Sequence, residues 1–444
     1  MSQAAPTGFA GLSHLGIVSS LAWASFGRTV VAYDSSGERV ASLAAGALPV
    51  HEPGLAELHV KTRAHVEWVS DAARLSVCPL VIVSLDVPTA DDNASDLTPV
   101  MALIDAIVPH LRQDVVLVVM SQVPPGFTRR LRTRIEQSRP DLRCILHYWV
   151  ETLIFGRAVE RALRPERCIV GCADSDTGVE PLFAKALSVY NCPILPMRYE
   201  SAELAKTAIN LYLIASVSYA NTLADLCEAV GADWGEIVPA LRLDQRIGPA
   251  AYLRPSLGIA GGNLERDLVT LRSLASEEGV DAVVFDGFSQ ANKKRYYWAL
   301  RMVNRYVMTQ SAKPRIAVWG LTYKKNTHST KNAPALRIIQ DLSAHAEFVA
   351  WDPVVRPQDV PRTAQVLGSL TDTLRNADAL LIMSDWDDFV RADLQPVRAN
   401  MKRSLIIDCA GVLEGRQKEL AGIEYVSMGR RPQGVGGATR SAQP

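Results

Sequence analysis

The chain has 444 residues, 48% of them hydrophobic and 21% charged, and its basic and acidic residues both number 47. This length and composition predict a globular protein of roughly two to three domains. The zero net charge offers no field that would attract nucleic acid or an anionic membrane. The longest apolar run, Val115 to Met120, is far too short to cross a bilayer.

The first residues and the cysteines favour a cytoplasmic protein. Met1–Thr7 is small and polar and has no charged flank before an apolar core, so it does not resemble a signal peptide. The seven cysteines are scattered and odd in number. Only Cys168 and Cys172 lie close together, in an apolar strand-like stretch. We interpret the cysteines as buried, reduced thiols.

In chain order, the first half alternates short β-branched runs with helical stretches, which predicts βαβ units and a parallel sheet. Its clearest strands are predicted at residues 29–33, 80–84 and 115–120. Ser201 to Val230 contains no Pro or Gly, and its apolar residues recur at helical spacing. This pattern predicts one unusually long helix that ends at Gly231.

A second βα alternation comes later in the chain, with strands predicted at residues 315–320, 347–351, 379–383 and 404–408. The end of the chain is rich in Gly, Arg and Ser, which is typical of a disordered tail. The predicted domains are an α/β domain at 8–198, a central helical domain at 199–305, a second α/β domain at 306–429 and a tail at 430–444.

Residues 11–16, Gly-Leu-Ser-His-Leu-Gly, form an altered dinucleotide-binding fingerprint. Gly11 would make the tight turn and Gly16 would let the helix pack on the strand. Ser13 stands where a second glycine normally lets the pyrophosphate approach. Asp34 ends the second strand, where an acidic side chain binds the ribose hydroxyls and favours NAD over NADP. By itself this pattern also fits an ordinary strand–helix turn. If it is a cofactor site, Leu15 is among the residues predicted to bind the cofactor.

Further motifs resemble, in order and spacing, the UDP-glucose 6-dehydrogenase (UDP-glucose/GDP-mannose, nucleotide-sugar) family. They are residues 51–55, 121–126, 203–210, 243–248 and 320–335. The resemblance extends from about residue 11 to about residue 413. It implies an α/β fold of two Rossmann-like doubly wound domains joined by a long central helix, and a homodimer. NAD would bind the N-terminal domain and a UDP-sugar or other nucleotide sugar the C-terminal one.

The resemblance also implies catalytic residues on the long helix. Lys206 and Asn210 stand at i and i+4, on one face of the helix. The family's equivalent pair binds the reacting oxygen and holds a water, where an ammonium and an amide stabilise developing negative charge. A solvated lysine is the alternative, although the neighbouring helix positions are apolar. Asp267 matches a family aspartate that tunes the lysine or assists proton transfer, and it also fits a helix N-cap.

The departures from the family pattern are concentrated at positions to which the family assigns catalysis or cofactor binding. Residues 260–267 read Ala-Gly-Gly-Asn-Leu-Glu-Arg-Asp where the family has Gly-Gly-Ser-Cys-Phe-Pro-Lys-Asp, so Asn263 replaces the nucleophilic cysteine. Gln122 replaces a loop threonine at the cofactor. Glu151 keeps one family glutamate, while Phe155 replaces the second, which the family uses for proton transfer.

The residues for the nucleotide end are better preserved. Arg246 matches an arginine that reaches the neighbouring subunit's substrate. Tyr252 and Gly258 lie in the loop over the sugar. Lys324 matches a lysine at the diphosphate, and Lys331 stands where the family has an arginine that reaches the cofactor. Each basic residue also fits a solvated surface charge.

These observations support three hypotheses. The first is an NAD-dependent nucleotide-sugar oxidoreductase that transfers hydride without the cysteine thioester step, stopping at a carbonyl or re-reducing it. The second is a non-catalytic paralogue that binds a nucleotide sugar. The third is a full dehydrogenase in which water attacks the aldehyde, with Glu151 or Asp267 as base. No zinc-ligand spacing, P-loop or Gly-x-Ser-x-Gly elbow occurs, so no metal site is predicted.

Overall fold

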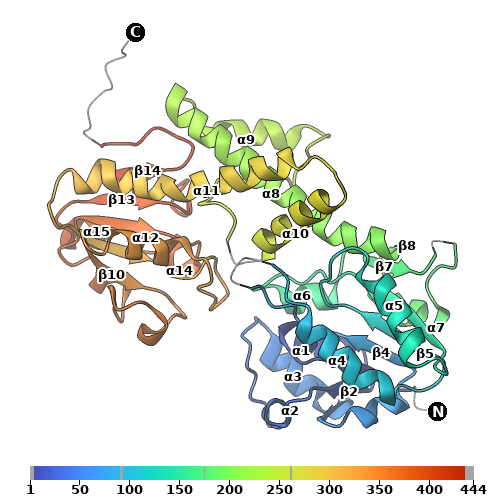
Figure 1. The fold of residues 1–444 in the computed structure, drawn as a ribbon. Helices are drawn as coiled ribbons and strands as arrows, with labels where there is room; N and C mark the ends of the chain where they lie inside the picture. The colour runs from blue at the N-terminus through green and yellow to red at the C-terminus, as the bar shows by residue number, and fades with distance from the viewer. Residues whose placement is uncertain (1–4, 91–93, 175, 261–262, 436–444) are drawn as a thin grey trace. The chain divides into compact units, whose positions relative to one another are not determined.

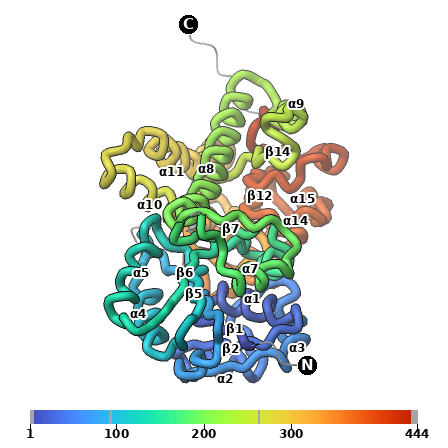
Figure 2. The backbone as a smooth tube through the Cα atoms, turned by 90° about the vertical axis from the view of Figure 1, so that its right-hand side faces the viewer, coloured from blue at the N-terminus to red at the C-terminus, as the bar shows by residue number. Residues whose placement is uncertain are grey.

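The computed structural model describes residues 5–90, 94–174, 176–260 and 263–435, with the side chain of Asn263 outside that description. The chain divides into two compact units, Met1–Ile209 and Asn210–Pro444. Helix α8 (Tyr199–Val230) passes from the first unit into the second without interruption (Figures 1 and 2). The expected α/β fold, with two Rossmann-like domains and a long helix, is confirmed.

The first unit is built on an eight-stranded sheet of order β3-β2-β1-β4-β5-β6-β7-β8. All neighbouring strands are parallel except β6 and β7. The strands are β1 Thr7–Ala10, β2 Val30–Tyr33, β3 Val66–Val69, β4 Leu80–Val83, β5 Val115–Val119, β6 Cys144–Trp149, β7 Cys168–Cys172 and β8 Ile194–Arg198. The helices before α8 are α1 His14–Ala24, α2 Gly37–Ala44, α3 Leu55–Thr62, α4 Thr98–Ile107, α5 Phe127–Ser138, α6 Ala158–Leu163 and α7 Pro181–Leu187.

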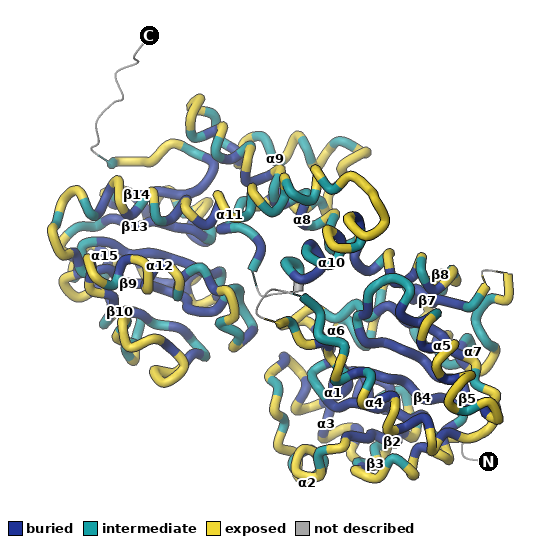
Figure 3. Tube along the Cα trace, viewed as in Figure 1, coloured by how far each residue is buried: buried dark blue, intermediate teal, exposed yellow. Residues whose placement is uncertain are grey.

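Alternate side chains of each central strand enter two separate cores, one on each face of this sheet. On β5, Val116 and Val118 pack with the buried face of α1, while Leu117 and Val119 pack with α4 and α5. Figure 3 shows the inner strands of the sheet buried along most of their length, whereas the edge strands β3 and β8 are largely intermediate or exposed. A sheet covered on both faces explains why these strands read as continuous apolar runs.

The second unit contains a six-stranded, all-parallel sheet of order β11-β10-β9-β12-β13-β14. Its strands are β9 Arg315–Trp319, β10 Glu347–Trp351, β11 Ala364–Val366, β12 Ala379–Ile382, β13 Leu405–Asp408 and β14 Glu424–Ser427. Its helices after α8 are α9 Trp234–Leu243, α10 Asn263–Glu277, α11 Val283–Val303, α12 Pro334–Leu342, α13 Leu370–Thr373, α14 Asp387–Val390 and α15 Gln395–Asn400. Two cores again lie on opposite faces of the sheet.

The predicted strands of both alternations and the long helix all form at the expected places. Gly231 ends α8 with a left-handed φ of +84°, and its N–H donates to the carbonyl of Cys227 at 2.9 Å. Near the end of the chain, Gln433 exchanges two backbone hydrogen bonds with Tyr425 of β14. The described chain is therefore still paired beyond residue 430, where the sequence predicts the tail; residues 436–444 of that tail lie outside the described residues.

Candidate active site

The turn between β1 and α1 requires glycine at the first and last positions of the dinucleotide fingerprint, Gly11 and Gly16. Gly11 has φ +92°, and an added Cβ would lie 2.8 Å from the Cβ of Leu85. A Cβ on Gly16 would lie 1.8 Å from the carbonyl oxygen of Gly11. Only glycine fits at either position, so α1 packs directly on the turn.

Asp34 comes directly after β2 and is held in one orientation. Its Oδ2 accepts the Leu12 N–H at 2.9 Å, its Oδ1 accepts the Ser36 N–H at 2.9 Å, and Arg39 pairs with it at 2.9 Å. The carboxylate keeps further lone pairs, because each oxygen can accept more than one bond. Its position suits the acceptor of ribose hydroxyls that the sequence predicts.

At the second glycine position, Ser13 does not cap its own helix. Its Oγ instead accepts the N–H of Asp86 at 2.8 Å, and the Oδ2 of Asp86 accepts the N–H of Leu15 at 3.0 Å. The turn thus fits a dinucleotide at Gly11, Gly16 and Asp34, whereas a serine and a carboxylate occupy the helix N-terminus.

Glu52 joins the turn to the segment that carries Glu151. Its buried carboxylate lies 2.8 Å from Nε2 of His14 and accepts the N–H groups of Gly156 and Ala158. Burial by itself raises the pKa of Glu52, but these hydrogen bonds outweigh it and hold the pKa below its usual value. Phe155 packs against His14 with the rings tilted and their centroids 4.4 Å apart.

The structure brings together Lys206 and Glu151, two of the predicted catalytic residues. The ammonium of Lys206 donates to the Glu151 carboxylate at 2.9 Å and to its carbonyl at 3.1 Å. Leu153 N–H donates to the other carboxylate oxygen at 2.7 Å. Both side chains are mostly buried, at 11% and 16% exposure, so the lysine is not a solvated surface charge.

The second unit brings together Asn210 and Asp267. The Asn210 amide donates to Oδ2 of Asp267 at 2.5 Å, and the buried Arg266 guanidinium lies 3.6 Å from Oδ1. Asp267 lies in the second turn of α10, so it is not the N-cap of that helix. Lys206 and Asn210 remain one turn apart along α8. Asn263 begins α10, but its side chain lies outside the described residues.

Glu203, which precedes Lys206 by one helical turn, has a role that the sequence did not reveal. It is fully buried and accepts the N–H groups of Gly126 and Thr128 at 2.6 and 2.7 Å. It therefore caps α5 and fixes the loop that carries Gln122. Burial raises the pKa of Glu203 despite these bonds.

The second unit repeats the turn geometry of the first. Gly320 has φ +94°, and a Cβ there would lie 2.0 Å from Ser384 Oγ. Asp352 accepts the Leu321 and Thr322 N–H groups at 2.8 and 3.2 Å, much as Asp34 accepts that of Leu12. The predicted Lys324 comes after this turn, with its ammonium 5.6 Å from the ring centroid of Tyr323.

The remaining predicted binding residues, three for the substrate and Lys331 for the cofactor, lie in the second unit. Gly258 has φ +99°, and a Cβ there would lie 2.2 Å from Oδ1 of Asn292, which accepts the Ile259 N–H. Tyr252 is 58% exposed. Arg246 is 89% exposed and pairs with Asp244. Lys331 is exposed in the turn before α12.

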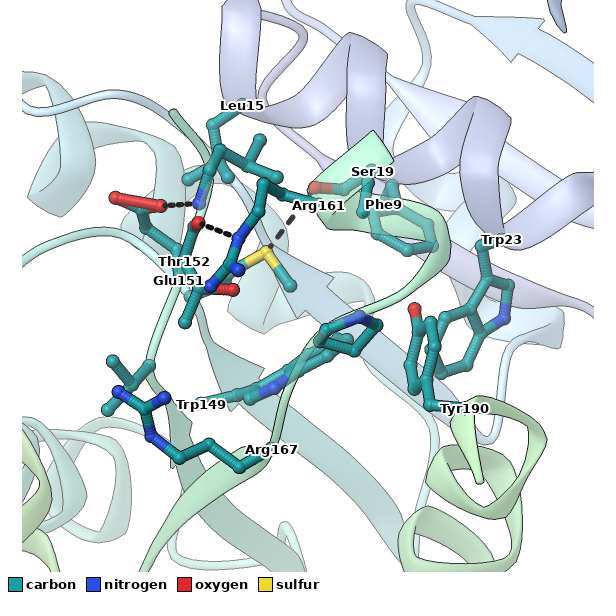
Figure 4. Close-up of a pocket in the computed structure, with 15 residues that line it drawn as sticks. Phe9, Leu15, Ser19, Trp23, Trp149, Glu151, Thr152, Arg161, Arg167 and Tyr190 are labelled. Atoms are coloured by element: carbon teal, nitrogen blue, oxygen red, sulfur yellow. Dashed lines mark hydrogen bonds between the residues drawn. The ribbon is translucent and has the colours of Figure 1, made fainter. Parts of the chain in front are cut away.

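One cavity lies inside the first unit, next to the first half of α1 (Figure 4). Leu15, Ser19 and Trp23 line it from one side of α1, opposite Trp149 and the loop that carries Glu151. The Arg161 guanidinium closes part of it by donating to the Thr152 carbonyl at 3.3 Å. The cavity therefore touches the candidate site through Leu15 and Glu151, and its lining mixes apolar side chains with polar ones such as Ser19, Arg167 and Tyr190.

Within the described ranges, no cluster of three or more His, Cys, Asp or Glu residues could hold a metal ion. No helix among these residues is both long and apolar enough to span a membrane.

Two doubly wound sheets, each with a glycine turn closed by an acidic residue, define a nucleotide-dependent oxidoreductase with a dinucleotide site in its first sheet. Sequence models of three parts of one family match the chain. The NAD binding domain of the UDP-glucose/GDP-mannose dehydrogenase family matches residues 7–191, its central domain residues 200–294 and its UDP binding domain residues 317–415. The chain belongs to this family and is an NAD-dependent oxidoreductase that acts on a CH–OH group of a nucleotide sugar.

Relatives match over nearly the whole chain. The UDP-glucose 6-dehydrogenase TuaD of Bacillus subtilis is 28% identical over 95% of this chain and 92% of its own. A UDP-glucose 6-dehydrogenase of Pseudomonas aeruginosa is 27% identical over 95% and 96%. In fold, the chain is similar to a UDP-glucose dehydrogenase from Pyrobaculum islandicum, with a TM-score of 0.83, 22% identity and coverage of 98% and 99%.

Proposed function

We propose that the protein oxidises a carbinol carbon of a UDP-hexose or related nucleotide sugar by hydride transfer to NAD and omits the thioester step. The observation that carries this proposal is Asn263 at the position of the family's nucleophilic cysteine. An amide cannot add to an aldehyde and leave again as a thiolate does. Phe155, at the place of the second family glutamate, packs against His14 and provides no base.

The cysteines of the chain support the same proposal. All seven are free, and five of them are buried. Burial raises the pKa of Cys78 and Cys144 to about 12 and that of Cys172 to about 11. Thiols with such pKa values are almost entirely protonated at neutral pH and are poor nucleophiles.

Lys206 and Asn210 supply the polar groups for the oxidation. NAD, when bound, would supply the acceptor for the hydride of the carbinol carbon, and the hydroxyl proton would leave to solvent. An ammonium beside the reacting oxygen stabilises the negative charge that develops there. Glu151 fixes the Lys206 ammonium, and Asp267 fixes the Asn210 amide. The Glu151 carboxylate accepts the Lys206 ammonium and the Leu153 N–H, so this proposal gives it the role of orienting Lys206 and not that of a base.

The remaining predicted residues receive binding roles in this proposal. Gly11, Ser13, Leu15, Gly16, Asp34, Gln122 and Lys331 would contact NAD. Arg246, Tyr252, Gly258 and Lys324 would contact the nucleotide sugar. Lysine suits a diphosphate because its compact ammonium binds a doubly charged group.

The experiment is to incubate the protein with NAD and a panel of UDP- and GDP-sugars, and to monitor NADH together with the mass and NMR of the product. We expect one NADH per sugar with a carbonyl product, or a sugar with one inverted centre and no net NADH. Two NADH per sugar with an acid product would refute the omission of the thioester step. Sugar binding with neither NADH nor product would instead identify a non-catalytic paralogue.

The same assay tests Lys206. Lys206→Ala should lower turnover by about a hundredfold or more, since it removes the charge beside the reacting oxygen. Lys61→Ala, which changes an exposed lysine on α3, should leave turnover unchanged. Equal turnover in Lys206→Ala and the wild type would remove Lys206 from the mechanism.

We also propose a homodimer. Tyr212, Tyr219 and Leu226 lie seven residues apart along α8 and are 72%, 48% and 54% exposed. Residues at this spacing share one face of a helix. A continuous exposed apolar stripe is typical of an interface between protein chains.

A further inference from the structure

Asp86 occupies the N-terminus of α1. The Ser13 hydroxyl faces away from its own helix and accepts the Asp86 N–H at 2.8 Å, while the Asp86 carboxylate accepts the Leu15 N–H at 3.0 Å. Asp86 therefore bonds to Ser13 and to Leu15, which lie 73 and 71 positions away in sequence. The carboxylate has replaced Ser13 as the cap of this helix.

The N–H groups at this helix N-terminus are the donors that a dinucleotide diphosphate uses in such folds. A carboxylate on Leu15 N–H places one negative charge where a second anion must approach. In the described parts of the chain, no basic side chain forms an ion pair with Asp86, so only the partial positive charge of the helix N-terminus offsets its negative charge. The Asp86 carboxylate and the NAD diphosphate are both negative, so they repel each other where both approach the Leu15 N–H.

Asp86 is also able to move. It is exposed, and it lies in the loop after β4, where its carboxylate holds one N–H group. A change of its side-chain rotamer would release Leu15 N–H. The Ser13 hydroxyl accepts the backbone N–H of Asp86, so this rotamer change would leave Ser13 in place.

We propose that Asp86 sets the affinity for NAD by competing with the NAD diphosphate for the Leu15 N–H, so that the cofactor binds only after this carboxylate swings away. This inference rests on the NAD site and not on the sugar or the product. Asp86 is thus an affinity-determining residue whose charge opposes the cofactor. An Asp86 that served only as a helix cap would stabilise the turn and would help NAD to bind.

Two variants separate charge from capping. Asp86→Asn keeps an oxygen that accepts the Leu15 N–H and removes only the charge. Ser13→Gly removes the hydroxyl that holds the Asp86 N–H and restores the second glycine of the fingerprint. The matched control is Asp114→Asn, which removes one exposed carboxylate at the amino end of β5, the opposite edge of the sheet. Asparagine tolerates the left-handed φ of +60° at this position.

The measurement is calorimetric titration of the full-length chain with NAD in the absence of sugar, so its outcome is independent of the product assay. We expect Asp86→Asn and Ser13→Gly to lower the Kd by about two- to fivefold, with no change in Asp114→Asn. Binding detected in Asp86→Asn but not in the wild type would support the same conclusion. An equal or higher Kd in Asp86→Asn, or no binding to any variant, would overturn the proposal.

Discussion

Glu52 connects three separate segments of the first unit through one buried carboxylate. It binds His14 of α1, the Gly156 N–H of the loop after β6 and the first N–H of α6. Because hydrogen bonds hold its folded-state pKa below the usual value of 4.5, its contribution to stability is complete above that pH. The contribution is lost as the pH falls through the lowered folded-state pKa.

We therefore predict that Glu52→Gln lowers the free energy of unfolding by about 1.5–3 kcal/mol at pH 7. The difference from wild type should shrink as the pH is lowered from 5 towards 3, because the wild-type carboxyl then becomes neutral as well. Urea unfolding at several pH values measures this. Glu160→Gln, which breaks a solvent-exposed pair with Arg157, serves as control and should change nothing measurable. A pH-independent difference at Glu52 would contradict the argument.

Residue roles could be predicted from the sequence where a local motif determines them. Gly11, Gly16 and Asp34 belong to one short turn pattern, and the structure places them as that pattern requires. Glu52 and Asp86 could not be assigned in this way, because their partners lie at least 38 and 71 residues away. Each uses an ordinary carboxylate on a backbone N–H, which leaves no sequence signature.

At the scale of elements, the sequence predicts inner strands such as β4, β5 and β12, because sheets buried on both faces demand uninterrupted β-branched runs. Strands such as β3 and β11, which are less buried, were not predicted. The length of α8 was predictable because no Pro or Gly interrupts it and Gly231 stops it. The capping of α5 by Glu203 of α8 could not be predicted, since that contact depends on how two helices pack.

The contact of α1 with its own turn gives a sharp prediction at this scale. Gly16→Ala places a Cβ 1.8 Å from the Gly11 carbonyl oxygen, a backbone atom that cannot yield without moving β1 or α1. We expect a loss of about 3 kcal/mol or more in unfolding free energy, together with loss of NAD binding. Thermal unfolding and NAD titration measure the two effects.

Gly37→Ala is the matched control, because Gly37 is also helical and an added Cβ there meets no atom within 4 Å. Alanine should be neutral at that position or stabilise the protein by up to about 1 kcal/mol. If Gly16→Ala melted at the wild-type temperature, the close approach of α1 to the turn would be disproved.

At the scale of the whole molecule, the two units contain the same type of nucleotide-binding turn. Each has a sheet of mainly parallel strands, a glycine with left-handed φ after one inner strand and an aspartate that accepts the next N–H. The sequence revealed this repetition as two βα alternations. The two turns differ in their polar side chains, since Ser13 and Asp86 alter the first turn and Lys324 lies just after the second.

The apolar stripe of α8 predicts the assembly of the molecule. Tyr212, Tyr219 and Leu226 expose apolar area on one helix face, and covering such area with a second copy removes it from water. We expect the wild type to sediment as a dimer at micromolar concentration. Tyr219→Asp should dissociate it, because a charge buried in the interface without a partner is costly. Val60→Asp, at an apolar residue on α3 that is 74% exposed, should leave the dimer intact. Analytical ultracentrifugation distinguishes these results, and a monomeric wild type, or a Tyr219→Asp dimer as stable as the wild type, would exclude this stripe as the interface.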